Sequence, residues 1–270
     1  LYSSAKKNTG IKIKKEIKPF DFEKELLKKV YLNKNFTKEI SDFLMLKYMS
    51  LDLKPYLPNG IFLFVGNKST GKSELAYSIA EVVIGSREDV SEIDLSMLTQ
   101  MISIKSEEEG KEEDENSTQF NIFKEMIKDN RKKVFLLKHI EFLSKKLFYI
   151  LTQIFSKGYI FVEGKKTSFD DSIFIITLDK HIVSTMTKKI GFQNINEEKN
   201  KIEIKELLIK QYSEDFISLF DGIYIFNDIT VEDYKEIFKR KLELIKTQVH
   251  ARGFNTSFSA SIIDYLANEY

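Results

Sequence analysis

The residues of this chain that could do chemistry begin with a glycine-rich run. Residues 66–73 read GNKSTGKS and match the pattern GxxxxGK[ST]. The two glycines let the backbone wrap closely, so that N–H groups face a phosphate, and a following helix N-terminus adds partial positive charge. We expect the ammonium of Lys72 to reach the outer phosphates, and the hydroxyl of Ser73 to ligate Mg²⁺ if the metal is bound.

The run therefore predicts a site for ATP or ADP. Its members are Gly66, Asn67, Lys68, Ser69, Thr70, Gly71, Lys72 and Ser73. The alternative interpretation is a glycine-rich turn that binds nothing.

The elements around the run fit this prediction. Ile61–Val65 is wholly apolar, as in a strand buried on both faces, and Lys72–Ile84 has helical spacing. Alternating strands and helices indicate an α/β fold with a parallel sheet and helices on both faces. The other expected strands are Ile93–Leu95, Val134–Leu137, Ile173–Leu178 and Ile223–Phe226, with a small hairpin at Tyr159–Val162 and Thr167–Phe169.

Expected helices lie at Phe22–Val30, Thr37–Met49, Phe120–Lys128, Ser144–Phe155, Val231–His250 and Ala260–Glu269. We divide the chain into a basic linker arm (1–19), a large α/β subdomain (20–227) and the start of a helical lid (228–270). Thr230 and Asp233 have the spacing of a capping box at the start of the lid.

Composition excludes several classes of function. With 270 residues and a net charge of +1, the chain has no overall field that would favour nucleic acid. The absence of cysteine excludes disulfides, zinc–thiolate sites and cysteine nucleophiles. No run approaches the ~20 apolar residues of a membrane span, and no signal-peptide pattern follows Leu1. We expect a fragment of a larger cytoplasmic protein with neither membrane nor nucleic acid as partner.

Five stretches carry a resemblance to the second AAA+ ATPase domain of Clp unfoldases of the ClpA and ClpC type. They cover the Walker A segment, the next strand, the Walker B strand with its helix, the sensor-one strand and the arginine-finger segment. In order, they read NGIFLFVGNKSTGKSELAYSIAE, EIDLSML, VFLLKHIEFLSKKLFYILTQIFSKGYI, DDSIFIITLD and YSEDFISLFDGIYIF. The match runs from about Lys29 to Tyr270 and ends before the second sensor motif of the family.

The resemblance implies a P-loop AAA+ module. Its fold would be a five-stranded parallel sheet flanked by helices, with the Walker A strand central, followed by a small, here incomplete, helical lid. The implied partners are further copies in a ring, expected to be a hexamer, polypeptide substrates and a ClpP-like peptidase.

Several catalytic positions of the family are altered. The Walker B Asp and Glu, which hold Mg²⁺ and activate water, are Lys138 and His139 here. At ~5 Å and an effective dielectric constant of ~20, an ammonium in place of a carboxylate weakens the hold on a divalent ion by several kcal/mol. Lys138 could replace part of the metal's positive charge. Sequence drift in an unused site explains both residues equally well.

Two further positions of that machinery differ. The sensor-one Asn is Asp179, and the arginine finger is Leu219. An arginine finger typically contributes 10³–10⁵ in rate. Glu141 matches an ordinary glutamate of the family, and we do not expect it to take over the catalytic role.

The substrate-contacting loop is altered as well. The aromatic pore loop of the family aligns with Glu113–Asn116, inside the acidic run Glu107–Glu115. The alternative interpretation of this run is a disordered, solvated loop.

A peptidase-docking motif is retained. Ile190, Gly191 and Phe192 match the I-G-F or I-G-L tripeptide with which family members dock on ClpP. The polar tract Gln193–Lys201 favours an exposed loop there; the alternative is packing of Ile190 and Phe192 onto their own domain.

Two functions remain open. One is a ring scaffold and docking platform that binds nucleotide without hydrolysing it. The other is a working ATPase and unfoldase domain that tolerates the altered residues. Lys138, His139, Asp179 and Leu219 favour the first.

Overall fold

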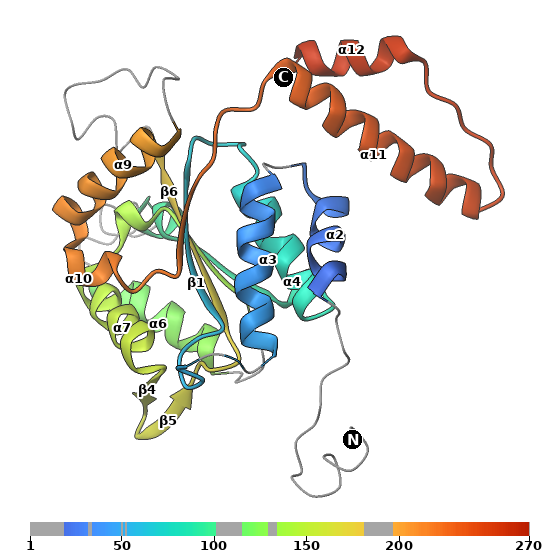
Figure 1. The fold of residues 1–270 in the computed structure, drawn as a ribbon. Coiled ribbons are helices and arrows are strands. Elements are labelled where there is room, and N and C mark those ends of the chain that lie inside the picture. The colour runs from blue at the N-terminus through green and yellow to red at the C-terminus, as the bar shows by residue number, and fades with distance from the viewer. Residues whose placement is uncertain are drawn as a thin grey trace, which may run out of the picture.

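The computed structural model describes residues 19–31, 34–49, 51, 53–100, 115–128, 134–180 and 197–269 (Figure 1). The expected basic arm therefore lies outside the described residues, apart from Pro19, which opens the first described helix. No helix of the described part is long and apolar enough to cross a membrane.

A five-stranded parallel sheet forms the centre, in the order β2-β3-β6-β1-β7, which confirms the expected fold class. The strands are β1 (Gly60–Gly66), β2 (Val90–Asp94), β3 (Val134–Lys138), β6 (Ile173–Asp179) and β7 (Gly222–Ile225). Strand β1 lies between β6 and β7, one place from the edge, so the central strand is β6 rather than the Walker A strand.

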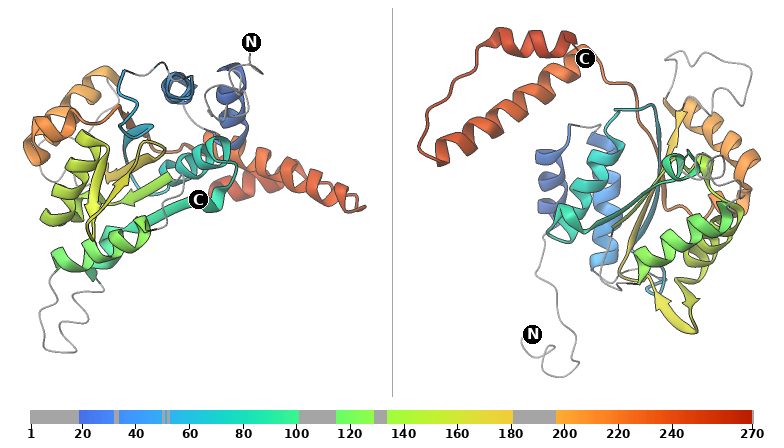
Figure 2. Two further views of the ribbon diagram at one scale, coloured as in Figure 1. Left: turned by 90° about the horizontal axis from the view of Figure 1, so that it is seen from below. Right: turned by 180° about the vertical axis from the view of Figure 1, so that it is seen from behind.

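Helices cover both faces of the sheet (Figures 1 and 2). One layer holds α2 (Pro19–Lys29), α3 (Lys34–Tyr48) and α4 (Lys72–Val83). The other holds α6 (Glu115–Ile127), α7 (Lys145–Lys157), α9 (Glu197–Tyr212) and α10 (Glu214–Ile217). Short 3-10 turns lie at Arg87–Asp89 and Ile140–Phe142.

Alternation along β1 divides the core between these layers. Phe62 and Phe64 pack with the layer of α2, α3 and α4, while Ile61, Leu63 and Val65 pack with the other. This is the two-residue period of a strand that is buried on both faces, as its sequence predicts.

A small antiparallel hairpin joins α7 to β6. It consists of β4 (Tyr159–Val162) and β5 (Lys165–Ser168), so its second strand starts two residues earlier than expected.

Two helices follow the sheet and stand away from it in Figure 1. They are α11 (Val231–Ala251) and α12 (Ala260–Glu269), linked by an ion pair of 2.8 Å between Lys235 and Asp264. The capping box is confirmed, because the Thr230 hydroxyl accepts from the Asp233 N–H and the Asp233 carboxylate accepts from the Thr230 N–H. The division of the chain into subdomains stays a prediction.

Three local expectations were wrong. Leu95 was expected in a strand, but β2 ends at Asp94, whose carboxylate accepts from the N–H groups of Ser96 and Met97 and so starts a helix at residue 95. Part of the polar tract expected as a loop is helical, since α9 begins at residue 197. Part of the expected acidic loop is helical too, since Glu115 and residue 116 begin α6; residues 113–114 lie outside the described part.

A pair of glycines tests how tightly the hairpin is joined to the body. Both Gly158 (φ +76°) and Gly164 (φ +79°) are left-handed, but a Cβ on Gly158 would lie 1.8 Å from the carbonyl oxygen of Tyr56, whereas a Cβ on Gly164 meets nothing. Gly158→Ala should therefore lower the free energy of unfolding by at least about 3 kcal/mol, and Gly164→Ala by only about 1 kcal/mol. Urea denaturation of both variants measures this difference. Equal losses would show that the contact with Tyr56 does not constrain the fold.

Candidate functional site

The glycine-rich run 66–73 forms the loop between β1 and α4. Ser69 (φ 62°) and Gly71 (φ 93°) are both left-handed, so the backbone curls around the Lys72 side chain. The Lys72 ammonium donates to the carbonyl oxygen of Gly66 at 2.6 Å and to that of Asn67. Gly71 caps α4 without a side-chain hydrogen bond, which leaves the first N–H groups of the helix available to an anion.

Close packing explains why residue 66 is a glycine. A Cβ there would lie 2.8 Å from the Cβ of Phe226 and 3.0 Å from the hydroxyl of Thr70. The Thr70 hydroxyl in turn donates to the Asn67 carbonyl at 2.9 Å. The geometry fits the phosphates of a nucleotide, since the uncapped N-terminus of α4 and the Lys72 ammonium both lie at the loop.

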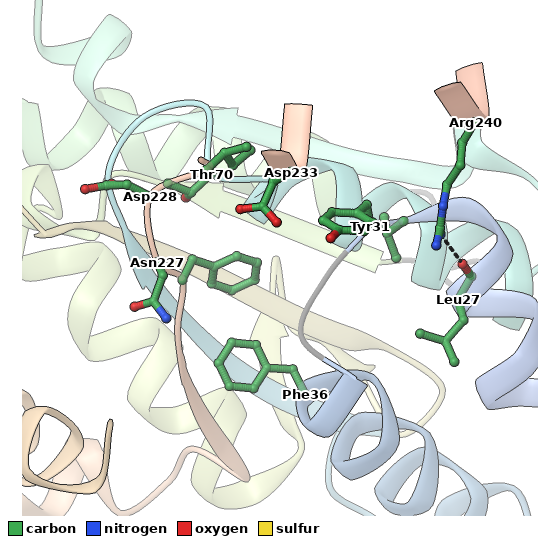
Figure 3. Close-up of a pocket in the computed structure, with 11 residues that line it drawn as sticks. Leu27, Tyr31, Phe36, Thr70, Asn227, Asp228, Asp233 and Arg240 are labelled. Atoms are coloured by element: carbon green, nitrogen blue, oxygen red, sulfur yellow. Dashed lines mark hydrogen bonds between the residues drawn. The ribbon is translucent and has the colours of Figure 1, made fainter. Parts of the chain in front are cut away.

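A cavity of about 490 Å³ opens beside this loop, a size ordinary for a small-molecule site (Figure 3). Its walls come from the loop, from α2 and the segment after it, from α3, from the segment after β7 and from α11. The lining residues are Leu27, Val30, Tyr31, Phe36, Thr70, Phe226, Asn227, Asp228, Ile229, Asp233 and Arg240. The three aromatic rings among them suit a flat heterocycle. Sequence reasoning did not identify this wall, because its members are brought together only by the tertiary fold.

Polar contacts connect the pieces around the cavity. The Asn67 amide donates to the Asp228 carboxylate at 2.7 Å, which joins the phosphate loop to the segment that leads into α11. Arg240 of α11 donates to the Leu27 carbonyl at 3.1 Å and lies over the ring of Tyr31 at 5.1 Å (Figure 3). Burial and a hydrogen bond with Asp233 raise the pKa of Tyr31.

At the end of β3, the Lys138 ammonium is paired with Glu92 of the neighbouring strand. The other carboxylate oxygen of Glu92 accepts from the hydroxyl of Tyr77 on α4. Burial, together with Glu92, raises the pKa of Tyr77 to about 12, so the phenol remains a donor. The carboxylate of Glu92 therefore balances the positive charge of Lys138.

These residues do not fit a firmly held Mg²⁺. Ser73 lies in the first turn of α4, but the position to which the resemblance assigns a metal-holding carboxylate is the cation Lys138. Among the described residues, no group of three or more His, Asp or Glu side chains could hold a metal ion.

His139 and Glu141 form a pair next to this position. His139 is left-handed (φ 61°), and its Nδ1 lies 3.1 Å from Glu141 Oε1, while its Nε2 lies 4.0 Å from Asp94 Oδ2. The Glu141 side chain is 3% exposed, and burial raises its pKa. Sequence reasoning did not assign a role to Glu141, yet the turn at 140–142 buries its side chain against His139. The spacing of two residues between His139 and Glu141 was the only sequence signal that could have indicated this contact.

Asp179 and Leu219 differ in their relation to the site. Asp179 ends β6 in register with Gly66 of β1, so it lies beside the start of the phosphate loop. Leu219 is partly buried and packs against the hydrophobic core. Ile190, Gly191 and Phe192 lie outside the described residues.

Comparison with known proteins shows which family and which relatives the chain resembles. The family AAA domain (Cdc48 subfamily) matches residues 57–223. The chaperone protein ClpB of Prochlorococcus marinus is 25% identical over 93% of this chain and 29% of its own length. ClpB of Malacoplasma penetrans is 26% identical over 91% of this chain and 35% of its own length. The ATP-dependent Clp protease ATP-binding subunit ClpE of Lactococcus lactis is 27% identical over 80% of this chain and 29% of its own length.

The chain thus spans about a third of the length of these relatives. Among solved structures, an S. cerevisiae Hsp104–ADP complex has the same fold, with a TM-score of 0.64, 19% identity and coverage of 89% of this chain and 42% of that one. A match over most of the α/β body, together with relatives of the Clp type, identifies the family: the chain belongs to the AAA domain (Cdc48 subfamily) family and resembles its Clp-type members.

Proposed function

We propose that this module binds ATP or ADP without appreciable turnover and serves as a scaffold in an AAA ring. One contrast supports this most strongly. The phosphate loop is complete and already surrounds Lys72, whereas the Lys138 ammonium occupies the position of the metal-holding carboxylate and is paired with Glu92. Phosphate binding uses backbone N–H groups and one lysine, while hydrolysis needs the side chains that have changed.

At the level of the whole protein, we propose a cytoplasmic Clp-type unfoldase or chaperone that acts on polypeptides as a hexameric ring. The ClpB and ClpE relatives support this role, and the name of the latter includes a Clp protease. Energy for unfolding would come from another ATPase domain of the intact protein.

One observation favours the second candidate, a working ATPase. A neutral imidazole held by a carboxylate could accept a proton from water, and His139 has such a partner in Glu141 at 3.1 Å. The position that the resemblance assigns to the metal-holding carboxylate is the cation Lys138, and Leu219 supplies no cation, so we place this candidate second.

Hydrolysis separates the two candidates. The chain incubated with ATP and Mg²⁺ should release phosphate at the background rate, and Lys72→Ala should give the same rate, because neither protein activates water. Phosphate release by both proteins at equal concentration is the measurement. A turnover of ~1 s⁻¹ that disappears in Lys72→Ala would establish the working ATPase instead.

Metal dependence tests the site itself. Nucleotide should bind weakly and with similar affinity in Mg²⁺ and in EDTA, since no carboxylate at position 138 holds the metal. Isothermal titration measures both affinities. Lys72→Ala should abolish binding, while Lys165→Ala, which removes an exposed lysine of β5, should leave it unchanged. Tight binding that requires Mg²⁺ would contradict the proposal.

We further propose that Ile190, Gly191 and Phe192 dock on a ClpP-like peptidase. One loop buries little apolar area and binds weakly, but several copies in a ring gain through effective concentration. The isolated chain should therefore barely bind the peptidase.

In the assembled full-length protein, Phe192→Ala should abolish coupling to the peptidase and leave the melting temperature unchanged. Degradation of a fluorescent substrate and thermal unfolding measure the two effects. The matched control is Phe161→Ala, which truncates a phenylalanine of β4 that is 68% exposed and should change neither. If Phe192→Ala lowers the melting temperature and preserves coupling, Phe192 is a core residue.

A further inference from the structure

The first turn of α4 carries an acidic residue beside the donors that would bind phosphate. Gly71 caps α4 without a side-chain hydrogen bond, and Glu74 is the third residue after this cap. A glutamate at this position can turn back towards the free N–H groups at the start of its helix, as it does in a capping box. A phosphate on the loop needs the same N–H groups, so a free Glu74 carboxylate would compete with it.

The carboxylate of Glu74 is instead held by an arginine. Its two oxygens accept from the two terminal nitrogens of Arg87, at 2.9 and 2.6 Å. A bidentate pair of this kind fixes the direction of the carboxylate as well as its distance, because the guanidinium is flat and rigid. Both oxygens of Glu74 are therefore engaged by a side chain from the turn that follows α4.

Arg87 is itself held in place. Its guanidinium lies over the ring of Tyr77 at 4.8 Å, and the hydroxyl of Tyr77 donates to Glu92, which fixes the far end of the ring. Hydrogen bonds from Arg87 lower the pKa of Glu74 more than the charge of Lys241 on α11 does. Arg87 is therefore the main cation that acts on this carboxylate.

We propose that Arg87 is a positioning residue for nucleotide binding because it keeps the Glu74 carboxylate out of the phosphate site, an inference that rests on the binding proposed above. Glu74 released from Arg87 can turn towards the start of α4, where its negative charge competes with the phosphates for the same donors and repels them. Arg87 does not have to touch the nucleotide for this effect. The affinity of the loop for phosphate thus depends on a pair of side chains outside residues 66–73.

Titration calorimetry of the whole chain with ADP in EDTA tests this role. Arg87→Gln should weaken ADP binding about three- to tenfold, because it frees the Glu74 carboxylate. Arg87→Gln combined with Glu74→Ala should bind ADP to within about twofold of the wild-type chain, because no carboxylate remains to compete. Glu74→Ala alone should not weaken binding. The control is Arg252→Gln, which removes the same charge from the exposed C-terminal end of α11 and should leave the affinity unchanged.

Rescue by the second substitution separates this role from a structural one and from direct contact with the nucleotide. If the double variant binds as weakly as Arg87→Gln, the effect does not pass through Glu74 and the inference is wrong. Unchanged affinity in Arg87→Gln would also overturn the inference and leave the proposed nucleotide binding intact. Failure of the wild-type chain to bind ADP would overturn both.

Arg87→Lys decides the matter if Arg87→Gln does not fold. A lysine keeps the positive charge but cannot bind both oxygens of Glu74 in a fixed direction. It should weaken ADP binding by at least about twofold, and Glu74→Ala should restore the affinity. Wild-type affinity in Arg87→Lys, or a loss that Glu74→Ala does not restore, would contradict the proposal.

Discussion

Burial of β1 along its whole length is the constraint on which the site depends. Every residue of the strand is buried, and alternate side chains pack into the two cores on opposite faces of the sheet. Each fully buried Phe, Leu, Ile or Val contributes roughly 1.5–3 kcal/mol, so β1 cannot slide without losing much of the core. Gly66 is held in place by this strand, and pairing with β6 fixes Asp179 beside it.

The proposed loss of hydrolysis without loss of binding has a physical reason, because the two depend on different parts of the site. A phosphate loop made of backbone N–H groups survives many side-chain substitutions, because its chemistry depends on φ and ψ more than on residue type. Ser69 and Gly71 retain the left-handed conformations that the loop needs. Hydrolysis, in contrast, depends on individual side chains. At two positions that the resemblance assigns to it, Lys138 is paired with Glu92 and Leu219 packs against the hydrophobic core.

Much of the fold could be predicted from local patterns. Ile61–Val65 predicted β1 because a short apolar run before a glycine-rich loop has few alternatives, and the spacing of Thr230 and Asp233 predicted the start of α11. Helix α9 was not among the expected helices. Its first turn is wholly polar, and among its described side chains only Ile204 and Leu208 are buried.

The site was harder to predict because much of it is tertiary. Lys72 was identified from its motif, and the position of Asp179 from the resemblance. The partner of Lys138 could not be found that way, since Glu92 lies on a strand far away in sequence and is brought near only by the β2–β3 pairing. The burial of Glu141 and the aromatic wall of the cavity likewise arise from packing between distant segments.

A crystal structure of the chain grown with ATP and Mg²⁺ would test the central claim, that the site binds nucleotide and has lost the metal-dependent chemistry. The account predicts intact ATP on the loop of residues 66–73, Lys138 still paired with Glu92, and no metal ion bound to Ser73. A Mg²⁺ ion in octahedral coordination by Ser73 and the β- and γ-phosphates, with Lys138 displaced from Glu92, would contradict it.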